Sequence, residues 1–179
     1  MSSSLFVDPE DDPRVEPPTR ADERTMLVEF LRWQRDTLEL KCGGLDAADL
    51  ARRAVPPSTL SLLGLVRHLA EVERAWFRRV MAGHDAPPLF YSEAELDADF
   101  DGATPDSDCV ARAWDAWRSE VAFADQFVAE APDLDVTGNH PRRGPVSLRW
   151  VLTHMLEEYA RHNGHVDLLR QRIDGAVGE

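Results

Sequence analysis

Apolar residues recur every three or four positions in four long stretches of the chain, a spacing that places them on one face of an α-helix. The stretches run from about 21 to 41, from 58–61 to 83, from 104–107 to 130, and from 147 to about 174. A shorter helix is expected over 45–53. No stretch alternates convincingly between apolar and polar residues, as a half-buried strand would. The pattern therefore predicts an all-α protein.

Capping and helix-breaking residues mark the ends of these stretches. Thr19 is expected to cap the first helix, with Asp22 three residues later, and Gly43 to stop it. Ser147 is the expected N-cap of the last helix, which Gly175 ends. Four amphipathic helices of this length pack most economically as a four-helix bundle. We expect the up-down-up-down order.

Two segments lie outside the predicted helices. Residues 1–18 are rich in proline and acidic residues, which predicts a disordered or loosely packed N-terminal arm. A single domain is expected over residues 19–179. A long connector over 84–104 separates the second and third helices. Connectors of such length are uncommon in compact domains and often serve as lids or binding segments.

Composition narrows the function classes. Asp and Glu outnumber Lys and Arg by 33 to 20, so the chain lacks the basic surplus that binding to nucleic acid requires. No apolar run approaches the roughly 20 residues that cross a bilayer, and the N-terminus lacks the features of a secretory signal. Cys42 and Cys109 are too far apart in sequence to suggest a thiolate metal site. We therefore expect a cytoplasmic protein with no nucleic-acid or membrane partner.

The last predicted helix carries ionisable side chains on the face that should be buried. His154, Glu158 and His162 are spaced by four residues, and His165 follows three later. Residues at these spacings share one side of a helix. Their burial is costly unless a partner compensates for the lost water. A metal ion would do so, and so would a buried hydrogen-bonded network.

A metal centre needs a ligand from a second direction, and His68 is the best candidate. It flanks the apolar stripe in the middle of the second helix, whereas His84 lies at a helix end and His140 in a loop. Taken alone, such a histidine is more often a hydrogen-bonded core residue. Two imidazoles and a carboxylate with open positions are typical of a catalytic zinc site. Iron, nickel, manganese and cobalt also suit these ligand types.

Glu73 also falls within the apolar stripe of the second helix. One interpretation is that its carboxylate orients a metal-bound histidine. The other is that it neutralises a buried arginine. The sequence leaves both open.

Two blocks of the sequence resemble a known family. Residues 61–80, SLLGLVRHLAEVERAWFRRV, and residues 154–167, HMLEEYARHNGHVD, are similar to those of the DinB-like metal-binding four-helix bundles. The similarity is greatest to the branch that includes the N-terminal domain of mycothiol-dependent maleylpyruvate isomerase. The resemblance implies that His68, Glu158 and His162 bind a divalent metal, with zinc expected first.

The resemblance also implies a chemistry. We expect a small-molecule substrate and thiol-dependent transfer or isomerisation, with a low-molecular-weight thiol such as mycothiol as the cofactor. His165 or His154 would be the nearest acid/base or orienting group, and the protein would form a homodimer. The alternatives are hydrolysis by a metal-bound hydroxide and a non-catalytic bundle in which the cluster, with or without metal, serves stability or partner binding.

Overall fold

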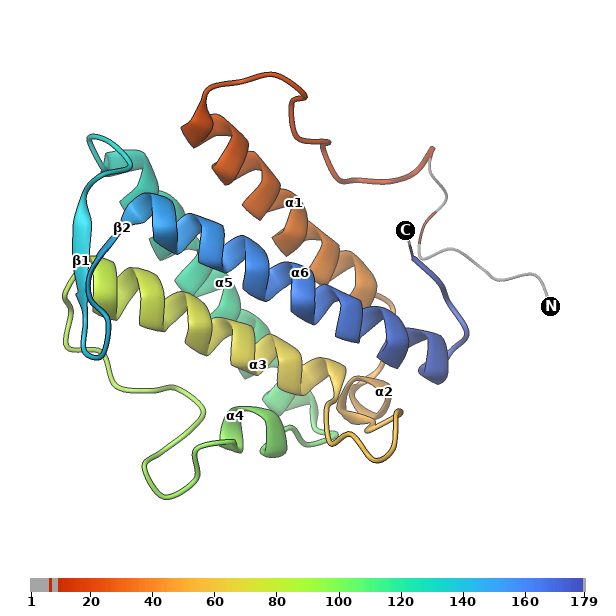
Figure 1. Ribbon diagram of the computed structural model, residues 1–179. Helices are drawn as coiled ribbons and strands as arrows, with labels where there is room; N and C mark the ends of the chain where they lie inside the picture. Colours follow the sequence, from red (N-terminus) through yellow and green to blue (C-terminus); the bar gives the residue numbers. More distant parts are fainter. Residues whose placement is uncertain (1–6, 8–9, 179) are drawn as a thin grey trace.

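The computed structural model describes residues 7 and 10–178, and it confirms the all-α four-helix bundle (Figure 1). Three short elements accompany the bundle: α2 (Ala47–Ala51), α4 (Ala98–Asp101) and a hairpin described below. Within the described residues, none of the helices combines the length and apolar character needed to span a bilayer. The bundle consists of α1 (Glu23–Cys42), α3 (Leu62–Glu73) with its π-helical continuation η1 (Arg74–Met81), α5 (Ser107–Glu130) and α6 (Leu148–Ile173).

The order of the helices differs from the prediction. α1 and α6 run in one direction and α3 and α5 in the other, so the bundle is up-down-down-up rather than up-down-up-down (Figure 1). Contacts between corresponding parts of the helices support the parallel pairs. Arg149 pairs with Glu23 near the starts of α6 and α1. Arg67 contacts Cys109 near the starts of α3 and α5, and Arg78 pairs with Glu120 further along both helices. The expectation was wrong because the long connector carries the chain back along α3 before α5 begins.

Side-chain caps define where the helices begin. Asp22, not Thr19, caps α1, since its carboxylate accepts a hydrogen bond from the Thr25 amide. Ser61 and Ser147 cap α3 and α6 in the same way, by accepting from the amides of Gly64 and Trp150. Ser147 is the cap that the sequence analysis expected, and Ser61 lies at the end of the expected range 58–61 for the start of the second helix. The cap of α1 was misplaced by three residues.

A β-hairpin occupies the loop between α5 and α6, where no strand was expected, and that expectation was wrong. Its strands, β1 (Thr137–His140) and β2 (Gly144–Ser147), pair in antiparallel register. They contain glycine and proline instead of alternating apolar residues, so their sequence signal is weak. Gly138 lies against η1, where a Cβ atom would be only 2.2 Å from the carbonyl oxygen of Val80. Glycine therefore permits the hairpin to dock.

The connector is not structureless. It contains α4, which packs on the first half of α3. The expectation of an N-terminal arm over residues 1–18 falls partly on residues outside the described ones. In the described part, the Arg14 guanidinium lies 4.3 Å from the centre of the Trp33 ring and donates to Thr37 on α1.

Candidate metal centre

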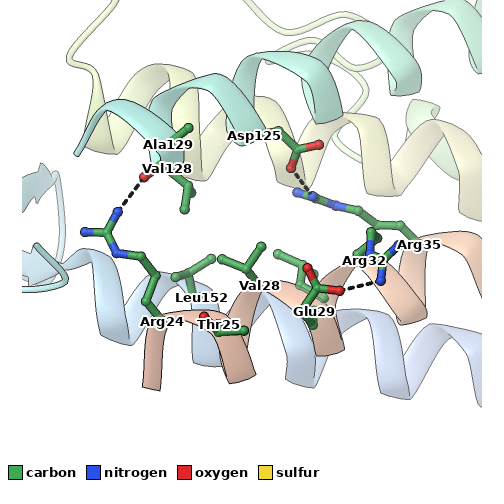
Figure 2. Close-up of a pocket in the computed structure, with 11 residues that line it drawn as sticks. Arg24, Thr25, Val28, Glu29, Arg32, Arg35, Asp125, Val128, Ala129 and Leu152 are labelled. Atoms are coloured by element: carbon green, nitrogen blue, oxygen red, sulfur yellow. Dashed lines mark hydrogen bonds and ion pairs between the residues drawn. The ribbon is translucent and has the colours of Figure 1, made fainter. Parts of the chain in front are cut away.

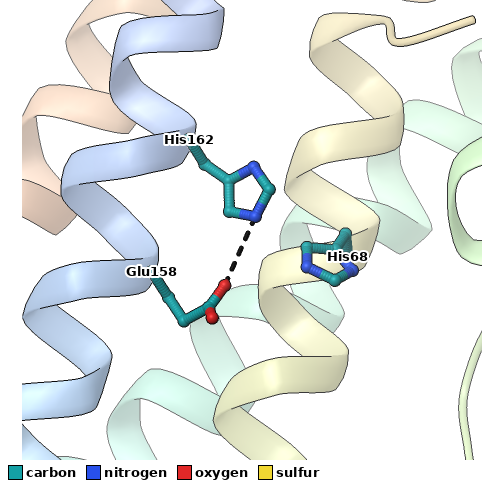
Figure 3. A group of neighbouring side chains, drawn as sticks. All are labelled: His68, Glu158 and His162. Carbon is teal, nitrogen blue, oxygen red and sulfur yellow. Dashed lines mark ion pairs between the residues drawn. The ribbon is translucent and has the colours of Figure 1, made fainter.

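The three residues predicted as metal ligands meet at the interface between α3 and α6 (Figure 3). Glu158 and His162 lie one turn apart on α6, and His68 faces them from the antiparallel α3. One ligand atom from each residue lies within 4.8 Å of the other two. The i and i+4 spacing therefore supplies two groups, and the packing of the bundle supplies the third.

His162 is the most deeply buried of the three. Its Nε2 atom is 3.4 Å from Oε2 of Glu158. Burial is the largest cause, and together with the neighbouring His68 and His165 it lowers the pKa of His162 from 6.5 to about 3. The imidazole is therefore neutral at physiological pH, and the neutral form is the one that binds metals.

His68 is oriented by a residue that the sequence analysis missed. Its Nδ1 atom is 2.8 Å from Oδ2 of Asp99, a buried carboxylate on α4 of the connector. The next residue, Phe100, stacks on the imidazole with ring centroids 4.3 Å apart. A carboxylate on one ring nitrogen fixes the tautomer and leaves the other nitrogen for a metal. The only signal in the sequence was the unusual length of the connector.

The other predicted histidines flank the cluster on α6. His154 places its Nε2 atom 3.7 Å from Oε1 of Glu158 and its Nδ1 atom 3.2 Å from Glu157. His165 places its Nδ1 atom 3.3 Å from Nδ1 of His162. Each of the three central residues thus has one polar neighbour outside the cluster, with Asp99 serving His68.

The chemistry of these donors fits a divalent cation. The set combines a carboxylate with two imidazoles, of which His162 is neutral and His68 has one ring nitrogen engaged by Asp99. Tetrahedral zinc with ligands at about 2.1 Å needs ligand atoms roughly 3.4 Å apart. The separation of 3.4 Å between His162 and Glu158 matches that value, and the limit of 4.8 Å for the whole set is slightly wider. The cluster could therefore hold a metal ion, whose identity the ligand types leave open.

An aromatic group continues from the cluster towards the hairpin. His154 lies edge-on to Trp76 of η1, with centroids 4.9 Å apart, and stacks on Trp150 at 5.0 Å. His140 of β1 stacks on the same Trp76 at 5.1 Å, and the Arg143 guanidinium lies 5.3 Å from Trp150. Trp76 and Trp150 thus place apolar ring surface against His154.

Glu73 takes no part in this cluster, which decides between its two interpretations. Its carboxylate accepts two hydrogen bonds from the buried Arg35 of α1, at 2.7 and 2.8 Å, and one from the Tyr159 hydroxyl. Glu73 is therefore the partner of a buried arginine.

A cavity of about 360 Å³ opens elsewhere, between α1 and α5 (Figure 2). Arg24 crosses one end to reach the carbonyl of Val128, and Arg35 crosses the other end to Asp125. The floor is apolar and includes Leu152. None of the clustered histidines or Glu158 lines this cavity, so it is separate from the candidate metal centre.

Comparison with known proteins agrees with this geometry. The model of the family described as mycothiol-S-transferase matches residues 26–175. The fold is similar to that of a crystal structure titled as a conserved protein of a locus from Enterococcus faecalis, with a TM-score of 0.61 and 14% sequence identity over 87% of this chain and 99% of that chain. Among curated proteins, no sequence matches this chain. The family match confirms the resemblance drawn from the sequence, and the structural similarity supports the fold.

Proposed function

Because the chain belongs to the mycothiol-S-transferase family, we propose that it is a metal-dependent transferase that joins a low-molecular-weight thiol, such as mycothiol, to a small electrophilic substrate. The observation that carries this proposal is the convergence of His68, Glu158 and His162 from two helices, with their ligand atoms within 4.8 Å. A structural role alone would not require a neutral imidazole, a carboxylate and an oriented histidine to share one point.

In this proposal, His68, Glu158 and His162 would hold the ion, and three protein ligands would leave room for a substrate group. A bound divalent ion would lower the pKa of a coordinated thiol, so that it attacks as a thiolate at neutral pH. Asp99 contacts His68 at 2.8 Å and His165 contacts His162 at 3.3 Å. These contacts would orient the two imidazoles so that the other ring nitrogen of each is free for a bound ion.

His154 is proposed to handle the proton that the thiol releases. Its Nε2 atom faces Glu158 at 3.7 Å, and its ring lies against Trp76 and Trp150. Trp150 is 37% exposed and would provide apolar ring surface beside His154 for the electrophile. Thiol, proton acceptor and electrophile would then occupy adjacent positions along the α3/α6 interface.

The test compares metal content and turnover in matched histidine variants. Untagged wild-type protein should carry about one equivalent of a divalent metal, measured by plasma mass spectrometry, and should consume electrophiles only when a thiol is present. His162→Ala should lose the metal and lower thiol-dependent turnover by at least about 100-fold. His84→Ala, which removes an exposed histidine outside the cluster, is the control and should keep both properties.

Three outcomes would contradict the proposal. Turnover that His162→Ala leaves unchanged would place the reaction elsewhere. Turnover that needs no thiol would favour hydrolysis by a metal-bound hydroxide. A wild-type protein that binds no metal, even after reloading, would make the cluster a polar network.

A further inference from the structure

The backbone of the connector is fixed to α3 by charged side chains of that helix. Glu71 accepts hydrogen bonds from the amides of Leu89 and Phe90. One turn earlier, Arg67 donates from Nε to the carbonyl of Asp99 and from Nη2 to the carbonyl of Ala98, both at 2.8 Å. These two side chains of α3 therefore hold the connector at two separate points.

Arg67 holds the connector at Asp99, the residue that contacts His68 of the candidate metal centre. Its side chain is buried, and its guanidinium also lies 4.4 Å from the centre of the Phe90 ring. Gly102 packs so closely that a Cβ atom there would be 2.7 Å from Nη2 of Arg67. A planar guanidinium can donate in two directions while stacking on a ring, which an ammonium group cannot do.

Asp99 joins Arg67 to His68. Its carbonyl accepts from Arg67, its Oδ1 atom accepts from the Phe100 amide at 2.9 Å, and its Oδ2 atom meets Nδ1 of His68 at 2.8 Å. The backbone and the carboxylate of Asp99 are therefore each held by a hydrogen bond that does not involve His68. A shift of the Asp99 backbone would move the carboxylate away from His68.

We propose that Arg67 is a positioning residue for the metal centre: it holds Asp99 so that the Asp99 carboxylate keeps the proton of His68 on Nδ1 and frees Nε2 as a ligand. Arg67 touches neither His162 nor Glu158 and acts only through Asp99. The proposal rests on the proposed metal-dependent function.

The test is a double-mutant cycle with two measurements. Zinc affinity is measured by competition with a chromophoric chelator for wild type, Asp99→Asn, Arg67→Lys and the double variant. Asp99→Asn should weaken zinc binding by about 10- to 100-fold, as is typical for outer residues of zinc sites. Arg67→Lys keeps the charge but loses the paired hydrogen bonds to the carbonyls of Asp99 and Ala98. It should weaken zinc binding by about 10-fold. In the double variant, Arg67→Lys should add nothing, because its effect passes through Asp99.

The second measurement is the tautomer of His68 in metal-free protein, read from the ¹⁵N shifts of its ring. Wild type should carry the proton on Nδ1, and Arg67→Lys should show a mixture of tautomers while keeping the wild-type circular dichroism spectrum. Arg74→Lys is the matched control. Arg74 binds the connector at the carbonyl of Pro87, away from Asp99, so this variant should leave affinity and tautomer unchanged.

Failure of this inference is distinguishable from failure of the proposed function. If wild type binds zinc and Arg67→Lys binds it equally well, or if the two substitutions have additive effects, Arg67 is not a positioning residue. If wild type binds no metal, the proposed function fails, and the tautomer of His68 in Arg67→Lys still decides the role of Arg67.

Discussion

Glu158 and Tyr159 are neighbours on α6, yet their side chains enter two different groups of polar residues in the core. Glu158 faces His68 and His162 at the α3/α6 interface. Tyr159 points to the bundle centre, where it donates to Glu73. The comparison of these two groups shows how a buried polar network differs from a candidate metal site.

The group around Tyr159 is closed. Arg35 donates to both oxygens of Glu73, Tyr159 donates to Oε1 of Glu73 at 2.8 Å, and the indole of Trp117 donates to the Tyr159 hydroxyl at 2.8 Å. Burial, with the nearby Glu73 carboxylate, raises the pKa of Tyr159 well above its usual value, so it remains a donor. These contacts satisfy the buried charge of Glu73 and leave no convergent lone pairs for an ion.

The group around Glu158 is open. Its imidazoles and carboxylate turn towards a common point at separations up to 4.8 Å, and their outer atoms are engaged by Asp99, His154 and His165. Lone pairs that converge without a shared proton are the arrangement a cation requires. Burial alone therefore does not distinguish a candidate metal site from a closed polar network, and the mutual arrangement of the ligand atoms does.

Breaking the closed group should have the largest effect on stability. Glu73→Leu leaves the Arg35 charge buried without its main partner, which should lower the free energy of unfolding by about 3 to 5 kcal/mol. Urea denaturation of metal-free protein measures the change. The double variant Arg35→Met/Glu73→Leu should recover most of the loss, because no unpaired charge remains. A single variant as stable as wild type would show that the network contributes nothing to the fold.

The open group should respond to acid. The pKa of His162 falls from 6.5 in the unfolded chain to about 3 in the folded protein. Between these values the unfolded state binds a proton that the folded state does not, so stability falls as the pH is lowered from about 6.5 towards 3. Between pH 7 and pH 4 the loss from this residue should be on the order of 3 kcal/mol.

The measurement is urea denaturation of metal-free wild type and His162→Leu at pH 7 and pH 4. The difference between the two proteins isolates His162 from the carboxylates that also titrate. His162→Leu should lose less stability on acidification than wild type. Equal losses would mean that His162 is protonated in the folded state at pH 4, and its environment would then be less buried than the structure indicates.

The sequence predicted the three clustered residues of the open group, but not the carboxylate that contacts His68. The spacing of Glu158 and His162 on a single helix follows from periodicity, and His68 followed from its place on an apolar stripe. The role of Asp99 did not follow, because it depends on the path of the connector, which Arg67 and Glu71 fix through contacts distant in sequence. The same path makes α3 and α5 parallel, so the sequence did not predict the relative directions of the helices either.

The closed group shows the same limit. Periodicity indicated that Glu73 is buried, but the choice of its partner depends on how α1 and α3 face each other. Arg24, Arg32 and Arg35 all lie on α1, and only Arg35 points to Glu73. Local patterns therefore predict which side chains are buried, and the packing of helices determines which of them meet.

The smallest expected effect on stability comes from filling the cavity between α1 and α5, which Arg35 of the closed group lines. Ala129→Leu places three more carbons against its apolar floor, which should raise the free energy of unfolding by about 0.5 to 1 kcal/mol. Ala122→Leu, the same change on an exposed part of α5 outside the cavity, should stay within about 0.5 kcal/mol of wild type.

Arg35 both lines the cavity and binds Glu73, so the closed group stands between the cavity and the histidine cluster. If that group is rigid, Ala129→Leu should leave zinc affinity unchanged in the chelator competition. A change in zinc affinity would show that the two polar groups are coupled through Arg35. The closed network and the candidate metal site would then not be independent of each other.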